Sequence, residues 1–306
     1  MEDKSVYFVV NPHSRAGKTG KNWDKMYTKI QQLIKYPSDF KIADGIGTGL
    51  EATTDAIKEG YTTIVGVGGE GTINECVNGI YNSNKKEITL GFIISGTVND
   101  YQHLIEWPMV LEEQVKLINE GETIQTPLTK VNGDSTRLSL NLADTGVSAL
   151  TAYMASIERK LLWIKGSFRY TLLALQAIKK WKNIPATINA DGREINGNLS
   201  MMMAGFSKDT GSYRMLPHAD TYGDKLAYTV AMDFSKFGMV SKLGMLKKGK
   251  HTEDIPGVYM GHASKIQIEA EKGLIFEVDG EPFSYDSTTI SIEALPGYLN
   301  VINPKK

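Results

Sequence analysis

The sequence has a single cysteine, almost no net charge and no long apolar run. Cys76 cannot form an internal disulfide, which suits a reducing compartment. The formal net charge is -1, so the chain has no overall positive field that would attract nucleic acid. The apolar run at 6–10 is too short for a signal sequence, and none elsewhere reaches the roughly 18 residues that a membrane span needs. We therefore expect a cytoplasmic protein without nucleic-acid partners.

The order of strand-like and helix-like segments divides the chain near residue 125. Before that point strands alternate with helices, which predicts an α/β domain with a parallel, Rossmann-like sheet. Beyond it, a pair of helical segments within 147–181 interrupts closely spaced strands, which are typical of a β-rich sandwich. We predict an α/β domain over 1–125 and a β-rich domain over 126–287.

Four glycines interrupt the segment IVGVGGEGTINECVNGI at 64–80, between a strand-like run and a helix-like run. A glycine turn before a helix exposes backbone amides that can bind a phosphate. A tight packing turn explains the same glycines equally well. No lysine follows them, so the segment is not a Walker-type phosphate loop.

Two further loops favour the phosphate interpretation. The segment ISGTVNDY at 94–101 ends the next strand and offers Gly96, Thr97 and the carboxylate of Asp100. The segment NPHSRAGKTG at 11–20 follows the first strand and supplies amides and cationic side chains. Because parallel strands end at one edge of their sheet, we expect these loops to face a common crevice.

The same segments resemble the motifs of the diacylglycerol kinase and sphingosine kinase superfamily. GGEGTINE at 68–75 resembles its GGDGTxNE signature, ISGTVND its PxGTxND loop, and NPHS its NPxSG loop. GTGLEA at 47–52, LPHADTYGDKLAY at 216–228 and FEVDGEPF at 276–283 match later family motifs in the family's order. The resemblance covers nearly the whole chain and is strongest to soluble bacterial lipid kinases.

That resemblance implies a two-domain fold with ATP in the cleft between the domains. It also implies that the segment 288–306 returns to the first domain. The residues implied to bind the nucleotide are Asn11, Pro12, His13, Ser14, Arg15, Thr48, Gly68, Gly69, Glu70, Gly71, Thr72, Asn74, Glu75, Gly96 and Thr97.

The resemblance also implies the catalytic and metal-binding residues. Glu281 would be the catalytic base, and Asp279 is the second choice; from spacing alone, both would be an ordinary turn. Glu70 and Asp100 would act with a catalytic Mg²⁺. A structural Mg²⁺ would be held by Asp224 and the carbonyl groups of Thr221 and Leu226.

Four positions depart from the family pattern. Glu70 replaces an aspartate, and Pro127 stands near the place of a third acid in the magnesium network. Arg15 and Lys225 each replace a glycine. These departures put full catalytic competence in doubt, because a misplacement of about 1 Å can cost about 100-fold in rate.

Basic and aromatic residues gather in two stretches that could meet an anionic membrane. Residues 159–182 and 236–250 contain lysine or arginine but no acid. In the second stretch Phe237, Met239, Leu243 and Leu246 are expected to be exposed. The segment MMMAGF at 201–206 is expected to be core rather than an acceptor slot.

We therefore expect an ATP- and Mg²⁺-dependent kinase that acts on diacylglycerol or a related lipid alcohol. Its expected partners are ATP, the lipid acceptor and the anionic inner face of the membrane. The sequence leaves open whether the chain forms a homodimer. An NAD kinase is one alternative, because that family shares the GGDGT and NE signatures. A nucleotide- or lipid-binding protein with little or no turnover is the other.

Overall fold

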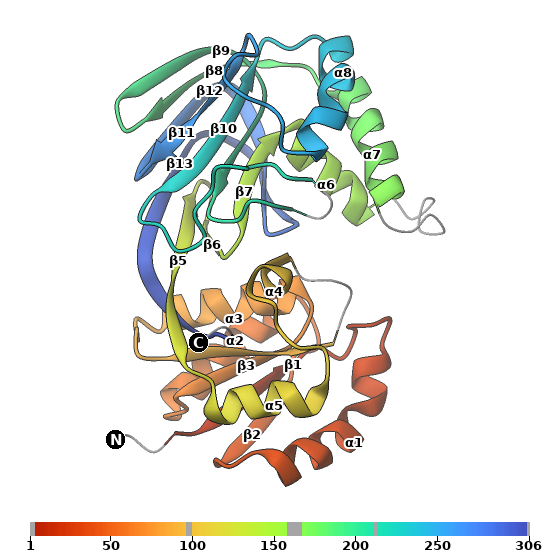
Figure 1. The fold of residues 1–306 in the computed structure, drawn as a ribbon, viewed down its shortest axis with the longest axis vertical. Helices are drawn as coiled ribbons and strands as arrows, with labels where there is room; N and C mark the ends of the chain where they lie inside the picture. Colours follow the sequence, from red (N-terminus) through yellow and green to blue (C-terminus); the bar gives the residue numbers. More distant parts are fainter. Residues whose placement is uncertain (1–3, 96–99, 158–166, 211–212, 305–306) are drawn as a thin grey trace. The chain divides into compact units, whose positions relative to one another are not determined.

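The structure, a computed structural model, describes residues 4–95, 100–157, 167–210 and 213–304 (Figure 1). The chain forms two compact units, one up to Thr126 together with the segment from Gly297, the other from Pro127 to Pro296. It leaves the first unit within β5 (Thr123–Asn132) and returns within β13 (Glu281–Ile302). The segment 288–306 was expected to return to the first unit, but its first part, 288–296, belongs to the second unit.

The first unit is built on a parallel sheet with the strand order β13-β4-β3-β1-β2. Its other strands are β1 (Val6–Val10), β2 (Ser38–Ile42), β3 (Thr63–Gly68) and β4 (Thr89–Ile94). Its helices are α1 (Lys18–Leu33), α2 (Thr48–Lys58), α3 (Glu70–Asn82), α4 (Asp100–Ile105) and α5 (Leu111–Glu120). Figure 1 shows α3 on one side of this sheet and α5 on the other. Strands β1 and β3 are buried throughout, as expected where helices cover both faces.

The helices of the first unit form because their apolar residues recur with helical spacing. Trp23 and Ile30 of α1 are buried, and so are Ala52, Ala56 and Ile57 of α2. Burying a large aliphatic or aromatic side chain of this kind contributes about 1.5–3 kcal/mol. Helices α2 and α3 pack against each other, as do α1 and α5. The predicted alternation of strands and helices is thus confirmed, although β2 was not predicted.

The second unit is antiparallel, and two long strands give it a closed arrangement. Strand β9 (Arg193–Gly205) pairs with β8 (Ile184–Ala190) along one part and with β7 (Leu142–Gly146) along the other. Strand β12 (Lys265–Val278) pairs with the same two strands. Each long strand therefore belongs to two parts of the sheet, which confirms the predicted β-rich sandwich. The remaining strands are β6 (Thr136–Ser139), β10 (Leu226–Met232) and β11 (Val258–Ala263).

Three helices accompany this sheet: α6 (Val147–Ile157), α7 (Ser167–Lys180) and α8 (Lys236–Lys247). The first two are the predicted helical pair and pack against each other. The core joins Leu173 and Ile178 of α7 to Met202, Ile268 and other strand residues. Helix α8 was not predicted as a helix. It begins at Ser235, whose hydroxyl accepts a hydrogen bond from the amide of Gly238 over 3.1 Å.

Candidate functional site

The strand order of the first unit places the ends of β1, β3 and β4 side by side. Strand β3 lies between β1 and β4, and the register pairs Val10 with Val67 and Gly68 with Ile94. The amide of Asn11 still donates to the carbonyl of Val67 over 3.0 Å, so the chain leaves β1 level with the end of β3. The carboxyl edge of the sheet is where ligands bind in open α/β folds.

Three helices begin at this edge on a glycine. The residues before α1, α2 and α3 are Gly17, Gly47 and Gly69, and none has a side chain that could accept from the first turn. The first amides of a helix have no partner within the helix and carry its partial positive charge. A Cβ atom placed at any of these glycines would meet no atom within 4 Å, so the backbone there is open to a ligand. This arrangement suits an anion with several oxygens, such as the phosphates of a nucleotide.

The loop after β1 has an unusual backbone. Arg15, Ala16 and Gly17 have φ angles of 53°, 55° and 80°, all in the left-handed region. Successive residues in turn conformations of this kind can form an anion-binding concavity. The geometry also explains why glycine suits position 15 and why Arg15 carries a strain on the order of 1 kcal/mol.

Side-chain hydrogen bonds hold this loop to the neighbouring strand ends. Asn11 donates from Nδ2 to Oγ1 of Thr72 over 3.1 Å and accepts at Oδ1 from the amide of His13 over 2.9 Å. The hydroxyl of Ser14 donates to the carbonyl of Asn11 over 3.0 Å. A hydrogen bond between Thr19 and Ser95, which is short, joins α1 to the end of β4.

The glycine at the end of β3 is required by close packing. A Cβ atom at Gly68 would lie 2.8 Å from Cβ of Thr72, closer than side-chain atoms approach in folded proteins. Thr72 is buried with its hydroxyl in the hydrogen bond to Asn11. Asn74 is also buried and accepts at Oδ1 from Nδ2 of Asn78 over 3.0 Å. Thr72 and Asn74, both predicted to bind the nucleotide, therefore support the turn through buried hydrogen bonds.

Glu75 and His13 hold the loop that precedes α2. The carboxylate of Glu75 accepts from the amides of Gly47 and Gly49 over 2.7 and 2.8 Å. Thr48 lies between those two glycines, so Glu75 fixes the backbone that presents it. His13 Nε2 lies 2.6 Å from Asp44 Oδ1 and connects the β1 loop to the same segment. Pro12 is half-buried and packs close to Gly20, where an added Cβ would lie 2.9 Å from its Cβ.

The two acids predicted to act with Mg²⁺ lie in the same part of the site. Glu70 Oε1 accepts a hydrogen bond from the amide of Asp100 over 3.3 Å, joining the start of α3 to the start of α4. Both residues are half-buried. Mg²⁺ is usually held by one or two carboxylates together with substrate phosphates, and this pair fits that pattern. The predicted residues Gly96 and Thr97 lie outside the described residues.

The DGE segment forms a tight turn in the second unit. Asp279 and Gly280 have φ angles of 49° and 84°, as in the Asp-Gly hairpin turn. The carboxylate of Asp279 is buried, accepts from the amides of Leu140 and Asn141 over 3.1 Å each, and takes a short hydrogen bond from Ser139. Asp279 is therefore occupied in fixing the turn. Glu281 follows it and is exposed.

The predicted structural metal site would combine one side-chain carboxylate with main-chain carbonyl groups. Asp224 is exposed, and Leu226 begins β10 opposite Ala263 of β11. The Lys225 ammonium lies 3.6 Å from Asp191 Oδ2 and so has its own anionic partner. Among the described residues, no group of three or more His, Cys, Asp or Glu side chains could hold a metal ion. A Mg²⁺ here would therefore depend on main-chain carbonyl groups and water.

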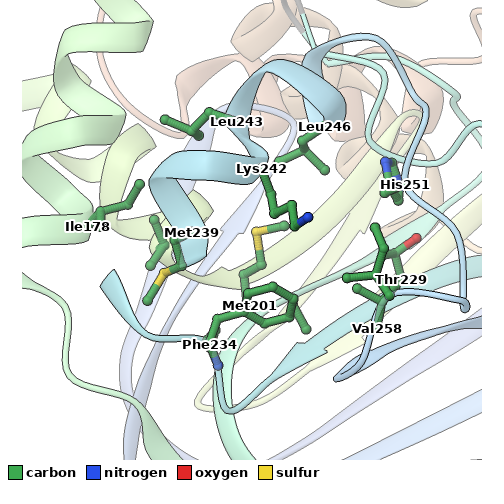
Figure 2. Close-up of a pocket in the computed structure, with 14 residues that line it drawn as sticks. Ile178, Met201, Thr229, Phe234, Met239, Lys242, Leu243, Leu246, His251 and Val258 are labelled. Atoms are coloured by element: carbon green, nitrogen blue, oxygen red, sulfur yellow. The ribbon is translucent and has the colours of Figure 1, made fainter. Parts of the chain in front are cut away.

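A small apolar cavity of about 70 Å³ lies under α8 in the second unit (Figure 2). Met239, Leu243 and Leu246 of α8 line it, together with Ile178 of α7 and Met201 of β9. Two lining residues have buried polar atoms without a hydrogen-bond partner, Oγ1 of Thr229 and Nδ1 of His251. Burial lowers the pKa of His251, which favours the neutral ring. The segment 201–206, expected to be core, thus also contributes to a cavity.

The surface of α8 differs from the prediction. Met239, Leu243 and Leu246 were expected to be exposed, but they line the cavity because they share the inner face of the helix. Phe237 is 83% exposed and Val240 is 42% exposed. Among the described residues, no helix has the length and apolar character to cross a bilayer.

Two family models match most of this chain. The diacylglycerol kinase catalytic domain matches residues 5–131, and the YegS C-terminal NAD kinase beta sandwich-like domain matches residues 142–303. The first match contains the loops at the carboxyl edge of the parallel sheet, and the second contains the DGE turn and the cavity.

Individual proteins are similar over most of the chain. A diacylglycerol kinase of Staphylococcus carnosus is 27% identical over 74% of this chain and 72% of its own length. One from Staphylococcus aureus is 25% identical over 91% of this chain and 86% of its own length. A crystal structure of a diacylglycerol kinase from Bacillus anthracis has a TM-score of 0.72 at 21% identity, covering 100% of this chain and 99% of the other. At that identity the last likeness shows the fold alone.

Proposed function

Because this chain belongs to the diacylglycerol kinase family of lipid kinases, we propose that it transfers the γ-phosphate of ATP to the hydroxyl group of diacylglycerol or a related lipid alcohol. The observation that carries the proposal is the group of three helix N-termini that begin on a glycine at one sheet edge. Their partial positive charge would favour the phosphates of ATP at this edge, and a ligand can approach the backbone at Gly69, where α3 begins. Arg15 and Lys18 add full positive charges to the same loop.

The cavity of the second unit, about 70 Å³ in volume, has room for a short apolar segment of an acceptor. Its lining side chains are mostly aliphatic or methionine, which suits a hydrocarbon chain better than a nucleoside. The unpartnered polar atoms of Thr229 and His251 would favour a ligand group that both donates and accepts a hydrogen bond. The NAD kinase alternative remains a competitor, because the second family model is named for that type of sandwich.

The transfer step requires an in-line attack by the acceptor hydroxyl. Its oxygen forms a bond to the γ-phosphorus while the bond from that phosphorus to the bridging oxygen of ADP breaks. We assign Glu281 as the base that takes the hydroxyl proton, because it is the exposed acid of the DGE turn. Asp279 is the weaker candidate, since its carboxylate already accepts hydrogen bonds from Ser139, Leu140 and Asn141.

We place the catalytic Mg²⁺ at Glu70 and Asp100, and a structural one at Asp224 with the carbonyl groups of Thr221 and Leu226. A bound Mg²⁺ would neutralise charge on the transferring phosphoryl group. Glu70 and the first turn of α4 would orient the phosphates, and the glycine turn at Gly68–Gly71 would lie against them. Pro127 supplies no carboxylate, so this chain would hold the ion with two acids.

We further propose that α8 lies on an anionic membrane surface. The exposed Phe237 would insert at the interface, and Lys236, Lys247, Lys248 and Lys250 would face lipid headgroups. Each lysine near such a surface contributes about 1 kcal/mol. Phe237→Ser should therefore weaken sedimentation with phosphatidylglycerol vesicles more than Phe168→Ser on α7, and equal binding by both variants would count against α8.

The deciding experiment is product analysis by mass spectrometry after incubation with Mg-ATP and mixed vesicles of diacylglycerol and other lipid alcohols. Wild-type protein should form a phosphorylated lipid, and Glu281→Gln should not. The exposed Glu51→Gln on α2 is the matched control and should keep full activity. Phosphorylation of NAD in a parallel reaction would favour the NAD kinase alternative. Binding of ATP without ADP release, given either acceptor, would identify a nucleotide-binding protein.

A further inference from the structure

Two acids that the proposed chemistry does not use face each other in the second unit. Asp144 of β7 and Glu277 of β12 are direct partners in the antiparallel register. They are only 4% and 3% exposed, respectively. Their carboxyl groups are placed to share a hydrogen bond, while the hydroxyl of the nearby Ser148 donates to the carbonyl of Thr145 over 3.2 Å. Two carboxyl groups can form such a bond only if one of them carries a proton.

Burial raises the pKa of both groups. The pKa of Asp144 rises to about 6. The pKa of Glu277 rises well above its ordinary value, through burial and then through the negative charge of Asp144. Burial therefore favours the protonated form of Glu277 beside Asp144. Oδ1 of Asp144 is buried without a hydrogen-bond partner, so a second negative charge on Glu277 would find little compensation.

The pair is connected directly to the turn that precedes Glu281. Glu277 Oε1 accepts a short hydrogen bond from the amide of Gly280. Oε1 of Glu277 thus holds the turn, which leaves its other carboxyl oxygen for a bond to Asp144. The charged group beside the pair is Asp279, whose negative charge also raises the pKa of Glu277. The segment of β9 opposite Asp144, Met201–Gly205, and helix α6 contain no charged residue.

We propose that Asp144 and Glu277 share one proton at neutral pH and that this shared proton positions the Gly280 turn, and with it Glu281, for phosphoryl transfer. The pair consists of positioning residues, and this role rests on the proposed function of Glu281. Loss of the proton leaves two opposed carboxylates beside Asp279, and their repulsion moves the turn. A displacement of about 1 Å at the base lowers the rate on the order of 100-fold.

The test combines two measurements that need no acceptor with one that does. The Asp and Glu carboxyl carbons are labelled with ¹³C, and the Glu277 resonance is identified by its absence from Glu277→Gln. This resonance should titrate at a pH far above the ordinary range for glutamate. The ¹⁵N–¹H signal of Gly280 should shift with the same midpoint in wild type and stay unchanged in Glu277→Gln. The turnover number should fall as the pH rises through that midpoint, and Glu277→Gln should keep its turnover number and lose this dependence. Glu277→Leu, which cannot accept from Gly280, should lose turnover while the KM for ATP is unchanged.

The outcomes separate this inference from the function on which it rests. If the Glu277 carboxyl titrates near its ordinary pKa, or if the Gly280 amide signal does not change during that titration, the pair does not share a proton that positions the turn. An alkaline fall in turnover that persists in Glu277→Gln overturns the positioning role. If wild type phosphorylates no acceptor at any pH, the proposed function fails, and the two NMR titrations still decide whether the pair holds the turn.

Discussion

Asn11 donates a hydrogen bond from Nδ2 to Oγ1 of Thr72 over 3.1 Å, and this bond joins the end of β1 to the first turn of α3. Thr72 is 3% exposed, so water cannot readily replace either partner. The start of the loop that leads to α1 and the first turn of α3 are thereby held together. The phosphate site thus depends on a buried side-chain contact as well as on its glycines.

Thr72→Val should weaken this arrangement without changing the size of the side chain. The substitution leaves Nδ2 of Asn11 without its acceptor, which costs about 1–3 kcal/mol. We expect a lower melting temperature and about tenfold weaker ATP binding by calorimetry. Thr28→Val on the exposed face of α1 is the matched control, since its hydroxyl donates only to the carbonyl of Asp24. Equal ATP affinity for both variants would argue that the bond is dispensable.

Gly68→Ala should disturb the site through overlap with Thr72. The added methyl group would lie 2.8 Å from Cβ of Thr72, and overpacking of this kind costs about 1–3 kcal/mol. We expect loss of measurable ATP binding together with reduced thermal stability. Gly244→Ala in α8 meets no atom within 4 Å and should stabilise the helix by up to about 1 kcal/mol. Unchanged nucleotide binding by Gly68→Ala would show that overlap with Thr72 does not disturb the site.

The buried acid pair should make stability fall as the pH rises. In the unfolded chain both acids release their protons near pH 4, whereas the folded chain keeps them to about pH 6 for Asp144 and higher for Glu277. Above pH 4 the folded state therefore binds more protons, and each retained proton lowers the free energy of unfolding by about 1.4 kcal/mol per pH unit.

The difference between wild type and the double variant Asp144→Asn with Glu277→Gln isolates this effect in urea unfolding. The variant should gain stability over wild type as the pH rises from 4 toward 7. Buried histidines such as His251 act in the opposite direction, since their lowered pKa makes stability rise with pH. They are present in both proteins and cancel. Parallel pH profiles for the two proteins would show that the pair titrates normally.

Filling the apolar cavity should affect the acceptor and leave ATP binding intact. Leu243→Trp places a larger side chain into the cavity, so the KM for long-chain diacylglycerol should rise at least about tenfold. A short-chain diacylglycerol should be affected much less. Val240→Trp is the control on the exposed side of the same helix. Equal effects of the two substitutions on both substrates would place the acyl chain elsewhere.

The sequence predicted the first unit well because its signals are local. The buried strand 63–68, for example, ends at Gly68, and α3 begins two residues later. Strand β2 was missed because most of its residues are exposed and polar, as expected at the edge of a sheet. Helix α8 was missed because Gly238 and Gly244 weaken its pattern, although Ser235 is an ordinary capping signal.

The candidate site was predictable where motifs are contiguous and hidden where they are not. The loops around Asn11 and Gly68 could be found from their residues, but the roles of Glu75 and Asn74 as internal supports required the structure. Asp144 and Glu277 meet because two strands distant in sequence pair in one register. No spacing along the chain could reveal that contact.

The return of β13 to the parallel sheet has a consequence for biosynthesis. Asn300 and Val301 pair with Thr89 and Leu90, so the outer edge of β4 stays open until that late segment leaves the ribosome. A nascent chain that has already made the nucleotide loops and the sandwich still lacks a strand of its first unit. An open strand edge invites pairing with other chains. Translation that stops before residue 297 would therefore release an aggregation-prone product.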